Sequence, residues 1–159
     1  MVPDPRTRPR VVRRVVSKLE EVVCESVSLD AIYGHQTRGP ATVAEMLRPL
    51  LEDEPIEVFV SILLNGKHRV FALAEVSRGT LTTSLVHPRE VFGSALRMSA
   101  AAVIVAHNHP SGDPEPSVED IEVTRRLRDA GKLLGVPLLD HLILGENAAF
   151  TSLRDRVDF

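Results

Sequence analysis

The chain of 159 residues has little cysteine and few aromatic side chains. Cys24 is its only cysteine, so no disulfide can form within the chain, which fits a reducing compartment. With no tryptophan and one tyrosine, it has little material for stacking nucleic-acid bases. No apolar run reaches membrane-spanning length, and the first residues lack the apolar centre of a signal peptide. We therefore expect a cytoplasmic protein with no membrane partner.

The chain also lacks a strong net charge. A formal charge of −3 gives no overall basic field that would attract nucleic acid, so any DNA contact would depend on a local patch. Hydrophobic residues make up 43% of the chain and charged residues 26%, which is ordinary for a globular protein. The length predicts one domain with a buried core.

The N-terminal segment, residues 1–39, combines an Arg/Pro-rich arm with a valine-rich pattern. Residues 1–10 hold three prolines and three arginines, and proline blocks regular backbone pairing. Apolar residues then recur at helical spacing over 10–25 and predict an amphipathic helix. The basic residues between them form either a solvated helix face, which we favour, or a phosphate-contacting arm. The valine-rich face would cover the domain's own core or a second subunit, which leaves a homodimer open.

The second segment, residues 40–159, alternates helical and strand patterns. Thr42 and Glu45 have the spacing of a capping box and predict a helix over 43–51. Asn65-Gly66 is a hairpin signal that calls for positive φ at both turn residues. The strands expected are 57–64, 68–76, 81–86, 101–106, 138–144 and 149–153, and the later helices are 88–98 and 118–134, the last between Ser117 and Gly135. This order predicts an α/β fold with a mixed sheet.

The stretch HNHPSGDPEPSVED, from His107 to Asp120, brings metal-ligating side chains together with turn-forming residues. Alternate residues of a strand face the same way, so His107 and His109 can direct their imidazoles at one ion if the strand extends to them. Asp120 would lie in the first turn of the next helix, above the end of that strand. Two histidines and one aspartate leave a fourth tetrahedral position open for water, as in catalytic zinc sites.

Ser117 stands three residues before Asp120 and would lie close to the same ion. Its hydroxyl is placed to donate a hydrogen bond to a developing oxyanion. The Ser-x-x-Asp pattern is also a capping box that needs no metal. A histidine such as His107, taken alone, is more often a core or surface residue than a ligand. The combination of all four residues at this spacing is what favours a metal site.

The pattern His-x-His, ten residues, then Asp with Ser three residues before it, resembles the JAMM metalloprotease motif. The full stretch resembles the RadC branch of that superfamily in particular. Similar stretches are GTL at 79–81, VHPREVF at 86–92 and LLDHLILG at 138–145. The resemblance covers about residues 40–145. It implies a single-domain MPN/JAB-like (cytidine-deaminase-like) α/β fold, with a mixed sheet flanked by helices.

The resemblance also implies Zn2+ as the cofactor, held by His107, His109 and Asp120, with Ser117 as oxyanion donor. It further implies an upstream glutamate as general acid/base. The residue we favour is Glu75, at the end of the expected return strand. Its alternative role is a solvent-facing strand residue, and the rival candidates for the catalytic role are Glu57 and Glu90.

Three further residues have two interpretations each. Asp140 and His141 interrupt an apolar strand. They either orient a metal ligand or form a buried pair that holds the sheet edge. Arg89 either binds a substrate carboxylate or braces the start of its helix, and we favour bracing.

Three functions remain at this point. The first is a zinc-dependent peptidase or isopeptidase acting on a peptide or protein. The second is a DNA-repair-associated DNA-binding or nuclease accessory protein. The third is a non-catalytic peptide-binding domain. The N-terminal region lacks the glycine-containing hairpin of the helix-hairpin-helix segment that RadC-like proteins usually carry, so no DNA-binding role carries over. Retention of every ligand favours the hydrolase.

Overall fold

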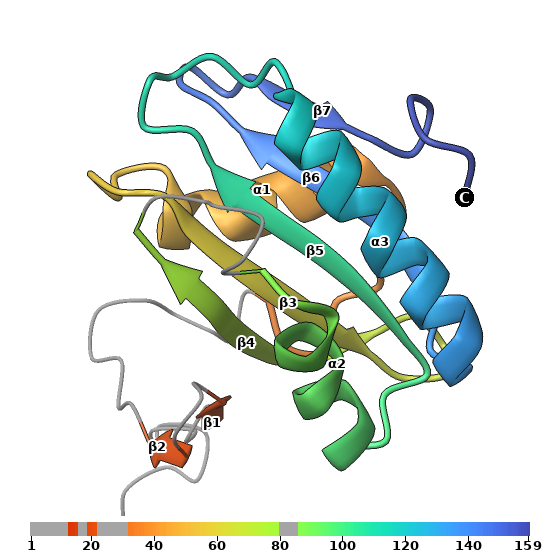
Figure 1. Cartoon of the computed structure of the whole chain (residues 1–159). Coiled ribbons are helices and arrows are strands. Elements are labelled where there is room, and N and C mark those ends of the chain that lie inside the picture. The colour runs from red at the N-terminus through yellow and green to blue at the C-terminus, as the bar shows by residue number, and fades with distance from the viewer. Residues whose placement is uncertain (1–12, 16–18, 22–31, 80–85) are drawn as a thin grey trace, which may run out of the picture.

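The computed structural model describes residues 13–15, 19–21, 32–79 and 86–159 (Figure 1). These residues contain a five-stranded mixed sheet, three helices and a separate pair of short strands. No helix within these ranges is both long enough and apolar enough to cross a membrane. The strand predicted at 81–86 lies outside them apart from its last residue.

The sheet has the strand order β4-β3-β5-β6-β7. Its central strands β3 (Val58–Leu64) and β5 (Ala102–Asn108) are buried along their whole length, as their continuous apolar runs require. Strand β3 pairs antiparallel with both β4 (Val70–Arg78) and β5. Strand β5 pairs in parallel with β6 (Leu138–Leu144), and the short edge strand β7 (Phe150–Ser152) completes the sheet.

The helices cover both faces of this sheet (Figure 1). Helix α1 (Pro40–Leu51) packs on one face, where its residues Val43, Leu47 and others join a core with alternate residues of the central strands. Helices α2 (Pro88–Arg97) and α3 (Val118–Leu134) pack on the opposite face and share a second core with the intervening strand residues. The predicted α/β fold with a mixed sheet flanked by helices is confirmed.

Helix α3 is the parallel crossover between β5 and β6, and it begins and ends as the sequence predicts. Ser117 is its N-cap, and the reciprocal capping box with Asp120 is formed. Gly135 ends the helix in the left-handed conformation, with φ 70°. The crossover therefore brings the first turn of α3 back to the end of β5.

The capping box predicted at Thr42 is not formed. Helix α1 begins three residues earlier, at Pro40, and its N-cap Gly39 makes no side-chain cap hydrogen bond. Proline has its φ fixed near the helical value and lacks the N–H that a first-turn residue would leave unpaired. Pro40 therefore starts the helix, and Thr42 lies inside its first turn.

The turn predicted at Asn65-Gly66 also differs. The left-handed residue of this hairpin is His68, with φ 54°, and neither Asn65 nor Gly66 has positive φ. The Asn65 side-chain oxygen accepts hydrogen bonds from the backbone N–H groups of Lys67, at 2.9 Å, and Arg69, at 3.1 Å. These bonds stabilise a longer loop, as asparagine often does in turns, and β4 begins later than expected.

The helix predicted over 10–25 is wrong where the structure describes this region. Residues Arg13–Val15 form β1 and Leu19–Glu21 form β2, and the two pair antiparallel. Valine is branched at Cβ, which favours extended backbone over helix, so the local preference runs against the helical spacing. The rest of the predicted helix lies outside the described residues.

Candidate metal centre

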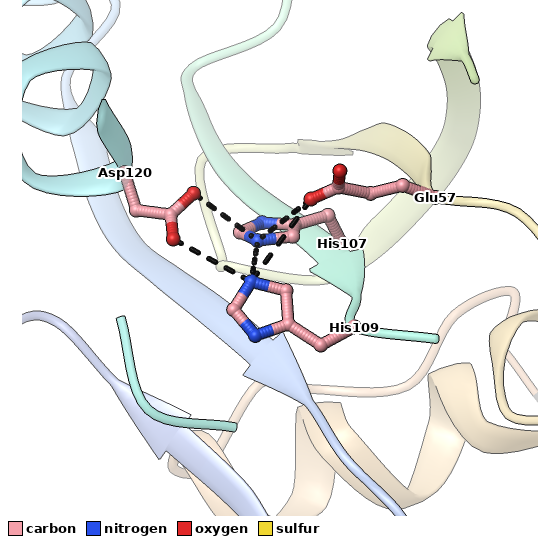
Figure 2. A group of neighbouring side chains, drawn as sticks. All are labelled: Glu57, His107, His109 and Asp120. Carbon is pink, nitrogen blue, oxygen red and sulfur yellow. Dashed lines mark hydrogen bonds and ion pairs between the residues drawn. The ribbon is translucent and has the colours of Figure 1, made fainter. Parts of the chain in front are cut away.

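Four side chains converge at the end of β5 (Figure 2). His107 is the second-last residue of β5, and His109 directly follows the strand. Asp120 lies in the first turn of α3. Glu57 lies immediately before β3. One ligand atom from each of these residues lies within 4.8 Å of the other three, which makes this a group that could hold a metal ion.

The register of the sheet explains why Glu57 joins this group. Strand β3 runs antiparallel to β5, and Phe59 pairs with His107. The residues just before β3 therefore lie beside those at the end of β5. Glu57 comes two residues before Phe59, so it lies on the same side of the strand and faces His109 and His107.

The Nε2 atoms of His107 and His109 face each other at 3.0 Å. The carboxylate of Asp120 approaches both, with Oδ1 at 3.3 Å from His107 Nε2 and Oδ2 at 3.5 Å from His109 Nε2. Glu57 Oε1 lies at 3.5 Å from His107 Nε2 and 4.0 Å from His109 Nε2. Two nitrogens and two carboxylates directed at one point form a set that attracts a cation.

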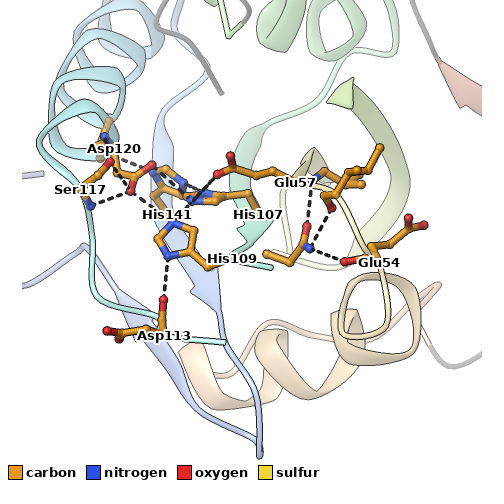
Figure 3. A network of polar contacts seen from close by, with 12 residues as sticks. Glu54, Glu57, His107, His109, Asp113, Ser117, Asp120 and His141 are labelled. Carbon is orange, nitrogen blue, oxygen red and sulfur yellow. Dashed lines mark hydrogen bonds and ion pairs between the residues drawn. The ribbon is translucent and has the colours of Figure 1, made fainter. Parts of the chain in front are cut away.

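A backbone carbonyl orients the ring of His109. Its Nδ1 lies 2.8 Å from the carbonyl oxygen of Asp113, in the loop between β5 and α3 (Figure 3). Because a carbonyl only accepts hydrogen bonds, Nδ1 carries the hydrogen. The neutral ring then presents the lone pair of Nε2 to the centre of the group. This donor set fits a zinc ion, which prefers imidazole nitrogen and carboxylate oxygen.

The electrostatics of the group also favour a positive charge at its centre. Burial opposes ionisation of the Asp120 carboxyl, but the neighbouring His109 and His107 in their protonated forms and the hydrogen bonds from Ser117 lower its pKa below the usual value. The hydrogen bond to Asp120 correspondingly raises the pKa of His109. Asp120 is therefore an ionised carboxylate. Its negative charge can stabilise either a protonated His109 or a bound metal ion.

Ser117 holds this carboxylate in place. Its backbone N–H and its hydroxyl donate to Asp120 Oδ2 at 2.8 and 2.7 Å, and its Oγ accepts from the Asp120 N–H at 3.1 Å. The structure thus brings Ser117 to the site in its capping role. Its role as an oxyanion donor remains a prediction.

Asp140 and His141 are both buried, and the His141 backbone N–H donates to Asp140 Oδ1 at 2.7 Å, but their side chains have different partners. The ring of His141 contacts the ring of His107, with Nε2 at 2.9 Å from His107 Nδ1 (Figure 3). Asp140 instead accepts bonds from the Ser152 hydroxyl at 2.9 and 2.7 Å and from the Arg154 N–H at 3.2 Å. His141 is thus beside a candidate ligand, whereas Asp140 holds the edge of the sheet.

Arg89 is placed at the start of α2, as the bracing interpretation expects. Its backbone N–H donates to the ring of His87 at 3.1 Å, and its guanidinium contacts the carboxylate of Glu90 at 3.0 Å. The Arg89 side chain is 76% exposed. The group of four does not include it.

The three glutamates that were candidates for the acid/base role, Glu75, Glu57 and Glu90, are now distinguished by position, and Glu90 contacts Arg89 at the start of α2. Glu75 receives two hydrogen bonds from Arg78, at 3.1 and 3.0 Å, on the edge strand β4. Within the described residues, Glu57 is the glutamate of the group and Glu75 is not part of it. The sequence signal for Glu57 was its place directly before the strand that pairs with the motif strand. Thr124, which contacts His141, was missed, although it lies one helical turn after Asp120.

Comparisons with known proteins identify the family of this chain. The family model described as "RadC-like JAB domain" matches residues 37–157. UPF0758 protein STH371 of Symbiobacterium thermophilum is 56% identical over 118 residues, which are 74% of this chain and 50% of that protein. A UPF0758 protein of Trichlorobacter lovleyi is 54% identical over 113 residues, 71% of this chain and 49% of that protein.

A third relative, UPF0758 protein GSU0386 of Geobacter sulfurreducens, is 56% identical over 121 residues, 76% of this chain and 52% of that protein. The chain thus spans about half the length of the curated relatives it matches. The matched region includes the sheet, α3 and every residue of the candidate metal centre. The chain therefore belongs to the RadC-like JAB domain family.

Proposed function

We propose that this domain is a zinc-dependent metallohydrolase of the JAMM type that cleaves a peptide or isopeptide bond. The observation that carries the proposal is the placement of a second carboxylate, Glu57, beside two histidine nitrogens and Asp120. Family membership adds support, because the JAMM motif of the sequence falls on the residues that converge. A bound zinc ion would supply a water molecule of lowered pKa at a fixed position.

We assign the ligand roles to His107, His109 and Asp120. Their ligand atoms approach one another at 3.0 to 3.5 Å, and Asp120 is only 6% exposed. The Glu57 side chain is 18% exposed and its Oε1 lies 4.0 Å from His109 Nε2. Glu57 thus lies farther from His109 than Asp120 does and is more exposed than Asp120, which favours a role for Glu57 beside the ion and open to substrate.

In this role Glu57 takes a proton from the attacking water and delivers it to the leaving amine. Such acid/base catalysis contributes about 10²–10⁴-fold to the rate when the group lies within hydrogen-bond reach of the proton. Ser117 would donate to the oxyanion of the tetrahedral intermediate. This requires its hydroxyl hydrogen to leave Asp120 Oδ2, to which it now donates at 2.7 Å.

The test compares Glu57→Gln with the matched variant Glu75→Gln. Zinc content is measured after dialysis, and hydrolysis is measured on a library of fluorogenic peptide and isopeptide substrates. We expect about one zinc per chain in all three proteins and loss of hydrolysis by a factor of roughly 10² or more only in Glu57→Gln. Asp120→Ala should lose the zinc.

Two results would contradict the proposal. Hydrolysis by Glu57→Gln at the wild-type rate would remove Glu57 from the mechanism. Tight zinc binding by a wild-type protein that captures peptides without cleaving them would identify a peptide-binding domain in place of a hydrolase.

A further inference from the structure

A chain of three polar contacts leads from His107 into the core. His107 Nδ1 lies 2.9 Å from His141 Nε2, and His141 Nδ1 lies 2.6 Å from Thr124 Oγ1. Thr124 Oγ1 in turn lies 2.6 Å from the backbone carbonyl oxygen of Asp120. All three side chains in this chain of contacts are completely buried. Water therefore does not compete for these groups, and each donor in the chain has to find its acceptor within the chain.

The final acceptor determines where the hydrogens lie. The Asp120 carbonyl oxygen can only accept, so the single hydroxyl hydrogen of Thr124 is donated to it. Thr124 Oγ1 must then accept from His141, which places a hydrogen on His141 Nδ1. A fully buried imidazole is disfavoured in its charged form. His141 is thus neutral, its Nε2 has a lone pair, and that lone pair accepts from His107 Nδ1.

We propose that Thr124 and His141 are positioning residues that select the tautomer of His107 with its Nε2 lone pair directed at the metal. This inference rests on the proposed function, because it assumes that His107 is a ligand. It gives His107 a neutral partner, where many ligand histidines donate to a carboxylate or a carbonyl. His109 has such a carbonyl partner in Asp113. Both ligand histidines thus carry their hydrogen on Nδ1, but the acceptor is His141 for His107 and a backbone carbonyl for His109.

Two further observations support a positioning role. The ring of Phe59 stacks on His107, with centroids 5.7 Å apart and an interplanar angle of 11°, and meets the edge of His141 at 5.3 Å. This packing holds both rings in the orientation that the contacts require. Thr124 also bonds the backbone of Asp120 through the same hydroxyl. One hydroxyl thereby links the orientation of two ligands.

The discriminating variant is Thr124→Val, which keeps the shape of the side chain and removes the hydroxyl. Without the hydroxyl, His141 no longer has a fixed tautomer and His107 no longer has a defined acceptor. Loss of a residue that orients a ligand typically lowers metal affinity about 10- to 100-fold. We expect this loss in Thr124→Val, recovery in Thr124→Ser, and no change in Thr37→Val, whose hydroxyl bonds His68 on an exposed turn.

Two measurements are made on each protein. Zinc affinity is measured by competition with a chromophoric chelator, and ring tautomers are assigned by long-range nitrogen–proton NMR of the zinc-free protein at neutral pH. The zinc-free wild type should show hydrogen on Nδ1 of both His107 and His141. Hydrogen on Nε2 of His107 in the wild type would overturn the inference, and so would unchanged zinc affinity in Thr124→Val. The wild-type spectrum decides the question even if Thr124→Val does not fold.

The outcomes also separate this inference from the proposed function. A wild-type protein that binds no zinc overturns both. Zinc binding that weakens in Thr124→Val, in a protein without detectable hydrolysis, overturns the hydrolase and supports the positioning role. Full hydrolysis with unchanged affinity in Thr124→Val overturns the positioning role alone.

Discussion

The side chain of Asn108 bonds the backbone of Val58, the residue directly after Glu57. Asn108 Oδ1 accepts from the Val58 N–H at 2.8 Å, and its Nδ2 donates to the carbonyls of Ile56, at 3.0 Å, and Glu54, at 3.2 Å. Asn108 lies between the two motif histidines and is 97% buried, with 3% of its surface exposed. One amide therefore fixes the backbone on both sides of Glu57 relative to the strand that carries the histidines.

Asn108→Ala should lower both stability and the proposed hydrolytic activity. The substitution leaves the buried N–H of Val58 without a partner, which costs about 1–3 kcal/mol, and removes the partly buried bonds to Ile56 and Glu54. We expect a loss of roughly 2 kcal/mol or more in the free energy of unfolding, measured by urea denaturation. Hydrolysis should fall more than zinc affinity, because the ligands do not depend on the released segment. The matched control is Asn65→Ala, at an exposed hairpin turn.

A wild-type turnover rate in folded Asn108→Ala would contradict this role. Equal losses of zinc affinity and turnover would also contradict it, because they would place the effect at the ligands.

The local part of the site was predictable, and the distant part was not. His107, His109, Ser117 and Asp120 belong to one strand end, one loop and one helix start, so spacing alone relates them. Glu57 joins them only through the pairing of Phe59 with His107, a register between strands that are far apart in the sequence. Nothing in the local pattern determines which residues of two such strands are paired.

Elements whose local preferences agree were predicted correctly, and conflicting ones were not. In α3, helical spacing, the Ser117 cap and the Gly135 stop all indicate the same helix. In 10–25, helical spacing conflicts with the preference of valine for strands, and the described residues are extended. At Asn65, the side chain accepts hydrogen bonds from the backbone N–H groups of Lys67 and Arg69. These bonds stabilise a longer loop in place of the two-residue turn that the dipeptide predicts.

Gly145→Ala tests the packing behind the motif loop. A Cβ at this position would overlap the carbonyl oxygen of Gly112 and come within 2.8 Å of Pro114 Cδ. Overpacking of this kind costs about 1–3 kcal/mol, and it would displace the loop whose Asp113 carbonyl orients His109. We expect a lower melting temperature and weaker zinc binding.

The control for this substitution is Gly66→Ala, where a Cβ would meet no atom within 4 Å. Gly66→Ala should match the wild type in both measurements. A Gly145→Ala protein with wild-type zinc affinity would show that the motif loop does not depend on this contact.

The stability of the metal-free protein should fall as the pH falls from about 6.5 to 4. Burial lowers the pKa of His141 to about 4, and burial, with the charge of His141, lowers that of His107 well below its usual value. Between these values and the unfolded pKa of about 6.5, the unfolded chain binds more protons than the native one. The contribution of these two histidines to the free energy of unfolding is therefore fully present above about pH 6.5. Below that pH it falls by up to about 1.4 kcal/mol per pH unit for each histidine.

His109 acts in the opposite sense, since its raised pKa adds stability below about pH 6.5 that is lost at higher pH. The measurement is urea denaturation in the presence of a chelator at several pH values. His141→Gln should reduce the slope between pH 6.5 and 4. A slope that is the same in His141→Gln as in the wild type would contradict the assignment of His141 as a buried neutral ring.

Ser61→Ala should leave the protein as stable as the wild type, or up to about 1 kcal/mol more stable. Ser61 lies in the middle of β3, between Ala74 on β4 and Val105 on β5. Its Oγ is buried and has no hydrogen-bond partner among the described residues. A hydroxyl without a partner loses its bonds to water on folding, and alanine removes this penalty at the expense of a very small cavity.

Ser117→Ala provides the contrast, because the same substitution there removes a helix cap and two bonds to Asp120. Loss of a serine cap costs about 1 kcal/mol. Urea denaturation of the two variants and the wild type at neutral pH gives the comparison. If Ser61→Ala were less stable than Ser117→Ala, the hydroxyl of Ser61 would have to make a bond in solution, and the interior of the sheet at this position would have to contain a partner for it.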